Sequence, residues 1–394
     1  MSDTSANQTT GWPVWHPTAA MFLVNGAVYG VWATQIPLAQ SRLNLDPSVL
    51  GTALLLLGAG AVTAMAGSGW IIQRIGTALL IRISAAIFCT WLPLTAIAPD
   101  AWSLAAIVFI FGASGGSMDV AMNASASEVE KRASRRYMSS FHGMWSIGGL
   151  IGASFATALL NVVSGPLQAL ILAAVLAVIF IWGQRKLHES RSVPTSGGGQ
   201  LAALRPSLIA ILVGIMAGLC FSGEGAVLDW AAIFLRDHFG VATQYANAGY
   251  VAFAGAMALG RFCGDAIRHR IDGATLVRAG CLLAFVGLLA GPLSGIAAVA
   301  VVGYALTGLG LSNIVPVLFS AAGAMPRPEA QIAVVSTMGY AGLLAAPPLL
   351  GFVAHATSLA GIFYIAAGAV LVIAALAGAC APASGSIEAL TTEG

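Results

Sequence analysis

Long apolar stretches alternate with short polar segments along almost the whole chain. An α-helix needs about 20 apolar residues to cross the roughly 30 Å hydrocarbon layer of a membrane. Twelve stretches have this approximate length, at residues 16–35, 49–72, 78–97, 102–125, 138–162, 167–184, 207–235, 242–264, 274–292, 296–324, 331–355 and 359–381. The pattern therefore predicts an all-α membrane protein with twelve transmembrane helices.

The composition agrees with this prediction and excludes several other classes. Of the 394 residues, 58% are hydrophobic and 8% are charged, whereas a soluble domain carries about 25% charged residues. No basic stripe with interleaved aromatic residues suggests a nucleic-acid partner. The five cysteines stand apart without the spacing of a metal or redox site. We therefore expect a lipid-embedded protein without a metal or cofactor.

Lysine and arginine are distributed unevenly between the two sides that the spans define. With both termini on one side, only Arg42 and Arg236 lie on the other side. Because cytoplasmic loops carry an excess of basic residues, both termini are predicted to be cytoplasmic, with no Lys or Arg near the middle of a span. The fifteen residues on the basic side are Arg74, Arg82, Lys131, Arg132, Arg135, Arg136, Arg185, Lys186, Arg191, Arg205, Arg261, Arg268, Arg270, Arg278 and Arg327.

A charged and then Gly/Ser-rich segment at 185–206 divides the spans into two sets of six. We predict bundles at 16–184 and 207–381, joined by this cytoplasmic linker and followed by a disordered tail at 382–394. The two halves repeat at an offset close to 198. For example, the tripeptide Gly-Ala-Val occurs at 26–28 and again at 225–227, and Gly67 matches Gly264.

Several segments resemble the major facilitator superfamily. The segment GSGWIIQRIG after the second span is similar to its signature, although Gln73, Thr77 and Ala78 replace an acid and two basic residues; GRFCGDAIRHRIDG keeps a shifted version with Asp265 and Arg268. The runs MDVAMNASASEVE, SSFHGMWSIGG and SGEGAVLDW resemble the fucose-permease-like branch, and most closely its YbjJ-like inner-membrane permeases.

The resemblance implies a monomeric secondary transporter in the inner membrane, with two pseudo-symmetric six-helix bundles that alternate access to a midplane site. The expected transported partners are protons and a small polar solute. A sugar-like solute would match the sugar symporters of this branch, but the resemblance does not fix the substrate. In sugar symporters of this branch a carboxylate in the fourth span carries the proton, and Asp119 matches that position.

The residues around Asp119 support the same role independently. Asp119 lies well inside its span, and an acid at that depth is costly and usually functional. Helical spacing places Asn123 on its stripe, and His142 with Ser146 on a stripe of the fifth span. We expect the acid, the amide and the imidazole to face one another. Asn123 and His142 are then candidates for solute binding. The alternatives are a permanently neutral acid hydrogen-bonded to Asn123 or a neighbouring helix, and a His142 near the inner interface whose hydrogen bonds are satisfied without solute.

Two further acids occupy the seventh span. Glu224 and Asp229 are five residues apart, which is about 140° around a helix, so they cannot both face one cavity. We predict that the deeper Glu224 binds solute or a proton and that Asp229 belongs to an outer gate.

Polar and aromatic residues on other spans are candidates for solute binding. Asn25, Tyr29 and Trp32 share a stripe that suits a polar ring, although the stripe could equally serve helix packing. Asn313 precedes Pro316, which predicts a kink. At the kink Asn313 either presents a carbonyl or amide to the solute cavity or has a structural role, and the sequence favours neither.

Charged residues at the cytoplasmic face are predicted to form the inner gate. They include Arg74, Asp265 and Arg268, with Glu128 and Glu130 pairing with loop arginines.

Two other functions remain open at this point. A proton-coupled exporter of amphiphilic compounds could use the same acids in antiport. A membrane sensor or assembly partner without transport is favoured only by Gln73 in the signature. No Walker-type phosphate motif and no Ser/His/Asp constellation occurs, so an ATP-driven protein or an enzyme is not expected.

Overall fold

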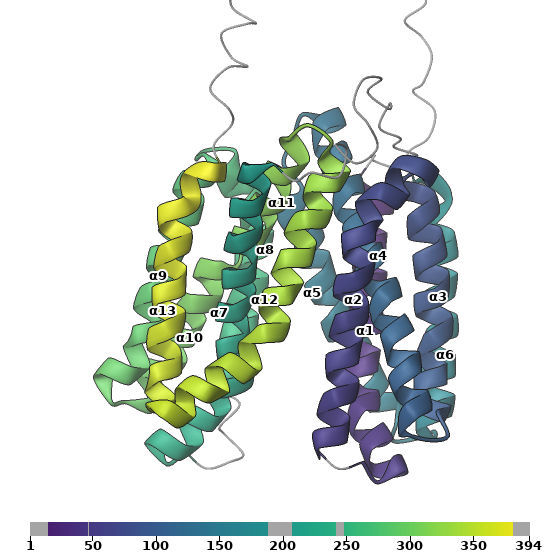
Figure 1. Ribbon diagram of the computed structural model, residues 1–394, viewed down its shortest axis with the longest axis horizontal. Helices are drawn as coiled ribbons and strands as arrows, with labels where there is room; N and C mark the ends of the chain where they lie inside the picture. The colour runs from purple at the N-terminus through teal and green to yellow at the C-terminus, as the bar shows by residue number, and fades with distance from the viewer. Residues whose placement is uncertain (1–14, 46, 188–206, 242–247, 381–394) are drawn as a thin grey trace, which may run out of the picture.

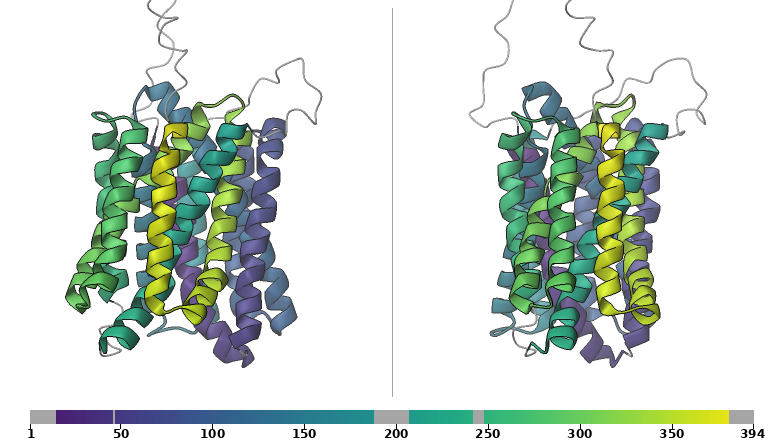
Figure 2. Two further views of the ribbon diagram at one scale, coloured as in Figure 1. Left: turned by 60° about the vertical axis from the view of Figure 1, so that its left-hand side comes forward. Right: turned by 90° about the vertical axis from the view of Figure 1, so that its left-hand side faces the viewer.

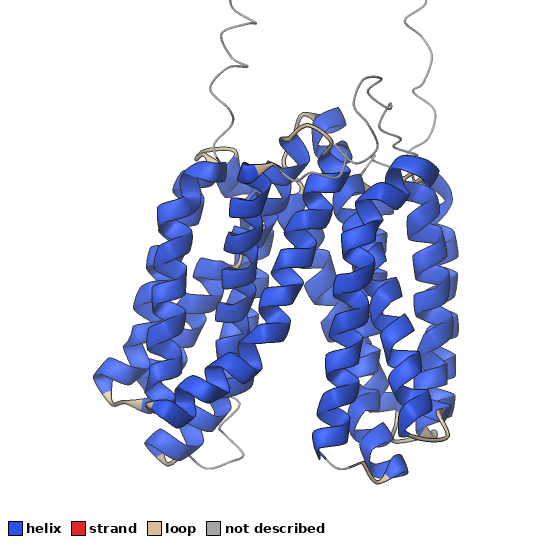
Figure 3. Ribbon diagram, in the orientation of Figure 1, coloured by secondary structure: helices blue, strands red, loops and turns tan. Residues whose placement is uncertain are grey.

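The computed structural model describes residues 15–45, 47–187, 207–241 and 248–380, and these residues form helices and connecting loops (Figure 3). The first half contains α1 (His16–Leu43), α2 (Pro47–Ile75), α3 (Thr77–Ile97), α4 (Ala101–Ala133), α5 (Met138–Leu159) and α6 (Gly165–Gly183), followed by the short η1 (Gln184–Lys186). The second half contains α7 (Leu208–Phe239), α8 (Ala248–Arg268), α9 (Gly273–Ser294), α10 (Ala297–Leu311), α11 (Ile314–Ala324), α12 (Pro328–Ala356) and α13 (Leu359–Leu376), followed by η4 (Ala377–Cys380).

The helices match the twelve predicted spans, with α10 and α11 forming one span. Ten described spans are long and apolar enough to cross a membrane. The other two are α5 and α8, whose apolar runs are interrupted by polar residues such as His142 on α5 and Arg261 on α8. The prediction of an all-α membrane fold is confirmed. Most of the predicted linker, the tail beyond 381 and the first predicted residues of the eighth span lie outside the described residues.

Local capping fixes several of the helix ends outside the apolar spans. Asp100 accepts a hydrogen bond from the Ser103 amide at 2.8 Å and begins α4, and Asp272 accepts one from the Thr275 amide at 2.9 Å and begins α9. The Thr275 hydroxyl also donates to Asp272, at 2.6 Å. The Ser103 amide lowers the pKa of Asp100, and the Thr275 hydroxyl together with its amide lowers the pKa of Asp272, because these bonds stabilise the ionised form. At its other end α4 stops at Ser134, which adopts a left-handed conformation.

The same set of neighbours occurs in both halves. In the first half α1 packs on α5 and α6, and α4 packs on α2 and α3. In the second half α7 packs correspondingly on α12 and α13, and α10 packs on α8 and α9. This agreement supports the internal repeat that the sequence offset of 198 predicted.

One pair of close helix contacts shows the repeat at the level of single residues. A Cβ atom at Gly112 of α4 would overlap the backbone oxygen of Leu57 on α2. A Cβ atom at Gly308 of α10 would overlap the backbone oxygen of Phe253 on α8, and both residues of this pair are displaced by 196 positions from the first pair. Small residues allow such approaches between helices in lipid, where packing replaces the hydrophobic effect as the driving force.

The two bundles approach each other at one end of the molecule and diverge toward the other (Figures 1 and 3). The approaching end, here called the basic end, is where α2, α4, α6, α8 and α11 finish. The first described helix begins there and the last one ends there, as the further views also show (Figure 2). Contacts between the bundles involve α2 and α4 with α12, α5 with α8, and α4 and α5 with α11.

The tenth span is broken where the sequence predicted a kink. Ser312 ends α10 and Asn313 begins α11. Pro316 is the third residue of α11 and has no amide hydrogen to donate to the preceding turn, so the helix ladder cannot continue across the break. The break therefore follows directly from the local sequence.

Candidate functional site

Asp119 lies on α4 at the interface between the bundles. The residue is 7% exposed, and its Oδ2 lies 3.4 Å from the Ser336 hydroxyl of α12, which belongs to the other bundle. No ion pair joins Asp119 to another described residue. A buried carboxyl with only a hydroxyl across the interface is chemically able to exchange a proton when water reaches it.

A polar chain runs from Asp119 to α5, as the helical stripes predicted. The Asn123 side-chain amide donates to the backbone oxygen of Asp119 at 2.9 Å, and Asn123 Oδ1 lies 3.2 Å from His142 Nε2. The half-buried His142 ring also packs against Phe22 and Phe319. The structure thus brings the acid, the amide and the imidazole together.

Arg261 is the residue of the site that the sequence interpretation missed. It was counted among the cytoplasmic arginines, but it lies inside α8 and is 6% exposed. Its Nη1 donates to the Ser146 hydroxyl of α5 at 2.5 Å, and that hydroxyl donates to the backbone oxygen of His142 at 3.1 Å. Arg261 therefore lies inside its helix, and not at the cytoplasmic margin where the predicted span placed it.

Glu224 and Asp229 differ in environment, as their spacing on one helix requires. Glu224 is half-buried on α7, close enough to Arg261 for their charges to interact, and its Oε1 accepts a weak contact from the Cys220 thiol at 3.9 Å. Asp229 is exposed nearer the diverging end, and it makes no ion pair with a described residue. Of the two acids, Glu224 is the one placed beside the polar chain.

The predicted stripe on α1 is divided between polar contact and packing. Asn25 Oδ1 accepts a hydrogen bond from Trp145 Nε1 at 2.9 Å, while its buried Nδ2 has no partner. The Tyr29 ring packs edge-on against Phe88 with 4.9 Å between centroids. The Trp32 ring packs on Phe111 at 5.6 Å and is 6% exposed. Trp32 thus follows the packing alternative, whereas Asn25 offers two free donors.

Asn313 is directed toward α8. Its amide nitrogen donates to the backbone oxygen of Gly260 at 2.8 Å and to the Ser312 hydroxyl at 2.9 Å. These bonds tie the break between α10 and α11 to the neighbouring helix. The geometry therefore gives Asn313 a structural role at the break, in place of the predicted contact with a solute.

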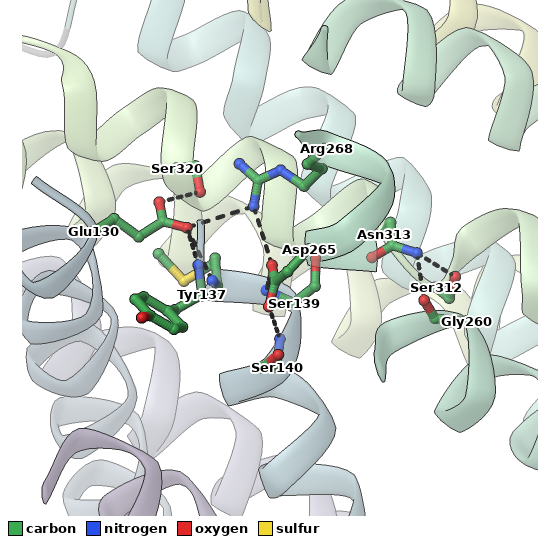
Figure 4. Close-up of polar contacts among 11 residues, drawn as sticks. Glu130, Tyr137, Ser139, Ser140, Gly260, Asp265, Arg268, Ser312, Asn313 and Ser320 are labelled. Atoms are coloured by element: carbon green, nitrogen blue, oxygen red, sulfur yellow. Dashed lines mark hydrogen bonds and ion pairs between the residues drawn. The ribbon is translucent and has the colours of Figure 1, made fainter. Parts of the chain in front are cut away.

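The second polar cluster lies at the basic end, around the first residues of α5 (Figure 4). Glu130 Oε1, from α4 of the same bundle, accepts from the amides of Tyr137 and Met138 at 2.8 and 2.9 Å. Asp265, from α8 of the other bundle, accepts from the next two amides. The distances are 3.0 Å to Ser139 and 2.8 Å to Ser140. Two carboxylates thus satisfy the four amides that a helix start leaves without partners.

Two further residues connect this cluster across the bundles. The buried Arg268 Nη1 lies 3.6 Å from Glu130 Oε1 and 3.9 Å from Asp265 Oδ1 (Figure 4). The Ser320 hydroxyl of α11 donates to Glu130 Oε2 at 2.8 Å. The contacts of Asp265, Arg268 and Ser320 therefore join the two bundles at the basic end. The gating roles of Asp265 and Arg268 stay a prediction.

Arg74 does not take part in this cluster. Its guanidinium lies 3.7 Å from the centre of the Trp70 ring, one turn earlier on α2. Among the described residues it makes no ion pair. Glu128 likewise pairs only within its own helix, with Arg132 at 2.7 Å. Of the residues predicted to form the inner gate, Glu130, Asp265 and Arg268 therefore belong to the cluster around the start of α5, and Arg74 and Glu128 do not.

The fold and this placement of polar groups define a class: a multi-pass helical membrane transporter with its polar groups between two bundles. No group of three or more metal-ligating side chains occurs in the described part of the chain. A family model described as the Major Facilitator Superfamily matches residues 18–333. The chain belongs to the major facilitator superfamily, and it is a transporter and not an enzyme.

Individual relatives support the same assignment. An uncharacterised MFS-type transporter of Yersinia pestis is 35% identical over 363 residues, covering 91% of this chain and 94% of the relative. An uncharacterised transporter of Sinorhizobium fredii is 33% identical over 367 residues, covering 92% and 97%. The solved structure of the fucose:proton symporter FucP of Escherichia coli has a TM-score of 0.76 at 16% identity, covering 94% of this chain and 99% of that chain. The fucose-permease-like fold is thereby confirmed, and the closer YbjJ-like resemblance stays a prediction.

Proposed function

We propose that this protein carries a small polar solute across the inner membrane together with protons, by alternating access, as a monomer with Asp119 as the proton carrier. The observation that carries the proposal is the position of Asp119, buried at the bundle interface with the Ser336 hydroxyl of the other bundle across from it. A carboxyl there changes its surroundings when the bundles rock. The same movement can therefore expose it to either side of the membrane in turn.

The direction of the two ends follows from the basic residues. If the basic end is cytoplasmic, as the positive-inside rule implies, both termini are cytoplasmic and this conformation is outward-facing. The polar contacts found between the bundles extend from the cluster at Glu130 and Asp265 to the level of Asp119. Opening toward the cytoplasm then requires the contacts at the start of α5 to break.

A second candidate function is proton-coupled export of amphiphilic compounds. The partly exposed Tyr29 ring, which packs on the buried Phe88 and Phe111, favours it because it offers apolar surface one turn from Asn25. In an exporter the solute and the proton move in opposite directions, whereas in the symporter they move together. The direction of proton movement that a solute induces therefore separates the two functions.

The proposal is tested with Asp119→Asn in proteoliposomes that contain a pH-sensitive dye. Asn keeps the size and hydrogen-bonding capacity of the protonated acid but cannot release a proton. With one proton per solute and the membrane potential clamped to zero, the wild-type protein is expected to accumulate solute about tenfold for each pH unit imposed, because one unit corresponds to about 1.4 kcal/mol. Asp119→Asn should show no accumulation while exchange of solute continues.

Glu128→Gln is the matched control, since its exposed pair with Arg132 lies on the same helix and outside the site. It is expected to accumulate solute like the wild type. Binding to the wild type should weaken as the pH rises, because the solute binds the form with a protonated carrier. Accumulation by Asp119→Asn under a pH gradient alone would exclude Asp119 as the carrier.

A further inference from the structure

Arg261 is a buried cation that proton transfer through Asp119 does not use. It lies seven residues before the end of α8, which places its backbone about 10 Å from the basic end of that helix. The residue is 6% exposed. Placing a guanidinium at this depth costs several kcal/mol unless the charge is paired, so its partners determine what the residue does.

The partners found for Arg261 leave its charge uncompensated. A guanidinium has five N–H donors, and the acceptor found here is one neutral oxygen, the Ser146 hydroxyl. The Nε atom is buried and has no hydrogen-bond partner. No ion pair joins Arg261 to a described carboxylate; Glu224 interacts with it only through space.

Arg268, on the same helix and similarly buried, shows the contrast. It has two carboxylates within ion-pair distance, Glu130 at 3.6 Å and Asp265 at 3.9 Å. The two arginines lie seven residues apart on one helix and both side chains are buried, but they differ in the number of carboxylates within ion-pair distance. Arg268 has two carboxylates within ion-pair distance, whereas Arg261 has no described carboxylate within that distance, so its donors are available to an incoming acid.

The position of Arg261 places those donors beside the proposed solute site. Ser146, its hydrogen-bond partner, belongs to α5 of the other bundle and is one turn from His142. His142 in turn contacts Asn123, which bonds the backbone of Asp119. The guanidinium and the proposed proton carrier are thus the two ends of one polar chain between the bundles.

We propose that the transported solute carries a carboxylate and that Arg261 binds it, so that the substrate class is small polyhydroxy acids and not neutral sugars. This inference rests on the proposed function. The planar fork of a guanidinium matches a carboxylate through two parallel hydrogen bonds, which a hydroxyl group cannot form. The carboxylate of the solute then pairs with the Arg261 guanidinium. When no solute is bound, Arg261 interacts with Glu224 only through space.

The proposal has a consequence for the charge that each cycle moves. One monoanion carried with one proton on Asp119 is electroneutral. A pH gradient then drives accumulation, and the membrane potential does not. A neutral sugar carried with one proton moves one charge, so the membrane potential would also drive its accumulation.

The experiment uses pairs of solutes that differ at one carbon: D-galacturonate with D-galactose, and D-gluconate with D-glucitol. Thermal stabilisation of the purified protein reports binding, and proteoliposome uptake with and without an imposed potential reports charge movement. The variants are Arg261→Gln and Arg261→Lys, with Arg278→Gln as the control because Arg278 is an exposed arginine of α9. We expect the wild type and Arg278→Gln to bind the acids and not their neutral partners, with uptake insensitive to the potential.

Arg261→Gln should bind the acids on the order of 100-fold more weakly, since charge-assisted bonds contribute about 1.5–3 kcal/mol each, and Arg261→Lys should recover part of the loss. Without solute, Arg261→Gln should melt no lower than the wild type, because it removes an unpaired buried charge. A lower melting temperature together with unchanged binding of the acids would assign Arg261 a purely structural contact with Ser146 and overturn the proposal.

Failure of this inference is distinguishable from failure of the proposed function. The proposed role of Arg261 would be overturned if D-galactose and D-glucitol bound as tightly as the two acids. It would also be overturned if neither acid stabilised the purified protein. Asp119-dependent accumulation of a neutral solute would then still uphold proton-coupled transport.

Discussion

Replacement of Asp265 by Asn tests whether the carboxylates at the start of α5 set the conformational equilibrium. In the wild type Asp265 uses both oxygens, at 3.0 Å from the Ser139 amide and 2.8 Å from the Ser140 amide. Asn offers a single carbonyl oxygen and no charge, so at most one bond survives, as a neutral one. The loss is confined to the conformation in which α8 and α5 meet at the basic end.

The size of the effect follows from the contacts that are lost. A hydrogen bond to a charged group contributes about 1.5–3 kcal/mol, and an acid at a partly buried helix start contributes up to about 2 kcal/mol through the helix dipole. These terms overlap, and water replaces part of them once the end opens. We therefore expect Asp265→Asn to destabilise the closed conformation, relative to the open one, by about 2–3 kcal/mol. This lowers the ratio of closed to open basic ends roughly 30- to 150-fold.

Spin-label distances measure this ratio directly. One label pair spans the basic end, at Ala133 of α4 and Ala324 of α11, and another spans the diverging end, at Asn161 and Ser294; all four residues are exposed. Asp265→Asn should lengthen the first distance and shorten the second.

The control for Asp265→Asn is Glu128→Gln. It removes an exposed pair within one helix, which contributes about 0–1 kcal/mol. Unchanged distances in Asp265→Asn, or an equal change in Glu128→Gln, would refute the reasoning.

Two further predictions concern topology and packing. The topology is tested in a Cys263→Ser background, which removes the exposed native thiol. Asn161→Cys should react with an impermeant maleimide in intact cells, whereas Ala133→Cys should react only after permeabilisation. The reverse result would show that the basic end lies outside the cell. Gly112→Ala should lower the free energy of unfolding by about 1–3 kcal/mol, because the added Cβ atom would overlap the Leu57 backbone. Gly67→Ala should leave the free energy of unfolding unchanged, because no heavy atom lies within 4 Å of its added Cβ atom. Equal melting temperatures for the two variants would contradict the close α2–α4 contact.

Much of the fold could be predicted from the sequence because lipid restricts the possible structures. Backbone groups in hydrocarbon must be satisfied within a helix, so apolar length alone located the spans. The break near Asn313 was predictable because Pro316 acts locally. The facing of Asp119, Asn123 and His142 was predictable because helical spacing fixes which side chains share a stripe.

The residues that sequence reasoning missed depend on helix ends and on contacts between bundles. The eighth span was expected to end at Gly264, which placed Arg261 at its margin. The helix continues to Arg268, so that Arg261 lies about two turns inside. A signal was present in the polarity of α8, because a basic residue close to a predicted end is as consistent with a longer helix as with a loop. The bonds from Asp265 to α5 could not be predicted, since no local pattern states which bundle a carboxylate will contact.

The gate is unequal between the two halves even though the fold repeats. At the offset of 197 that relates Gly67 to Gly264, Asp265 corresponds to Ser68. Ser68 donates to the Ala64 backbone within its own helix, while the neighbouring Gly69 lies so close to the start of α12 that a Cβ atom would come within 2.9 Å of Ala330. The first bundle therefore meets α12 through close packing, and the second meets α5 through charge.

This inequality places the proposed solute contact and the gate on a single helix. Arg261, Asp265 and Arg268 are spaced by four and three residues on α8, so they share one face. That face contacts α5 twice, through Arg261 at Ser146 and through Asp265 at Ser139 and Ser140. A carboxylate that draws Arg261 away from Ser146 weakens one of the two contacts that hold α8 against α5. The bonds from Asp265 to Ser139 and Ser140 are then the remaining contact of this face with α5. Because a helix moves as a unit, a shift of α8 at Arg261 also strains the closed contact at Asp265. Solute binding and gate opening are thereby linked through the position of α8, without a separate signalling element.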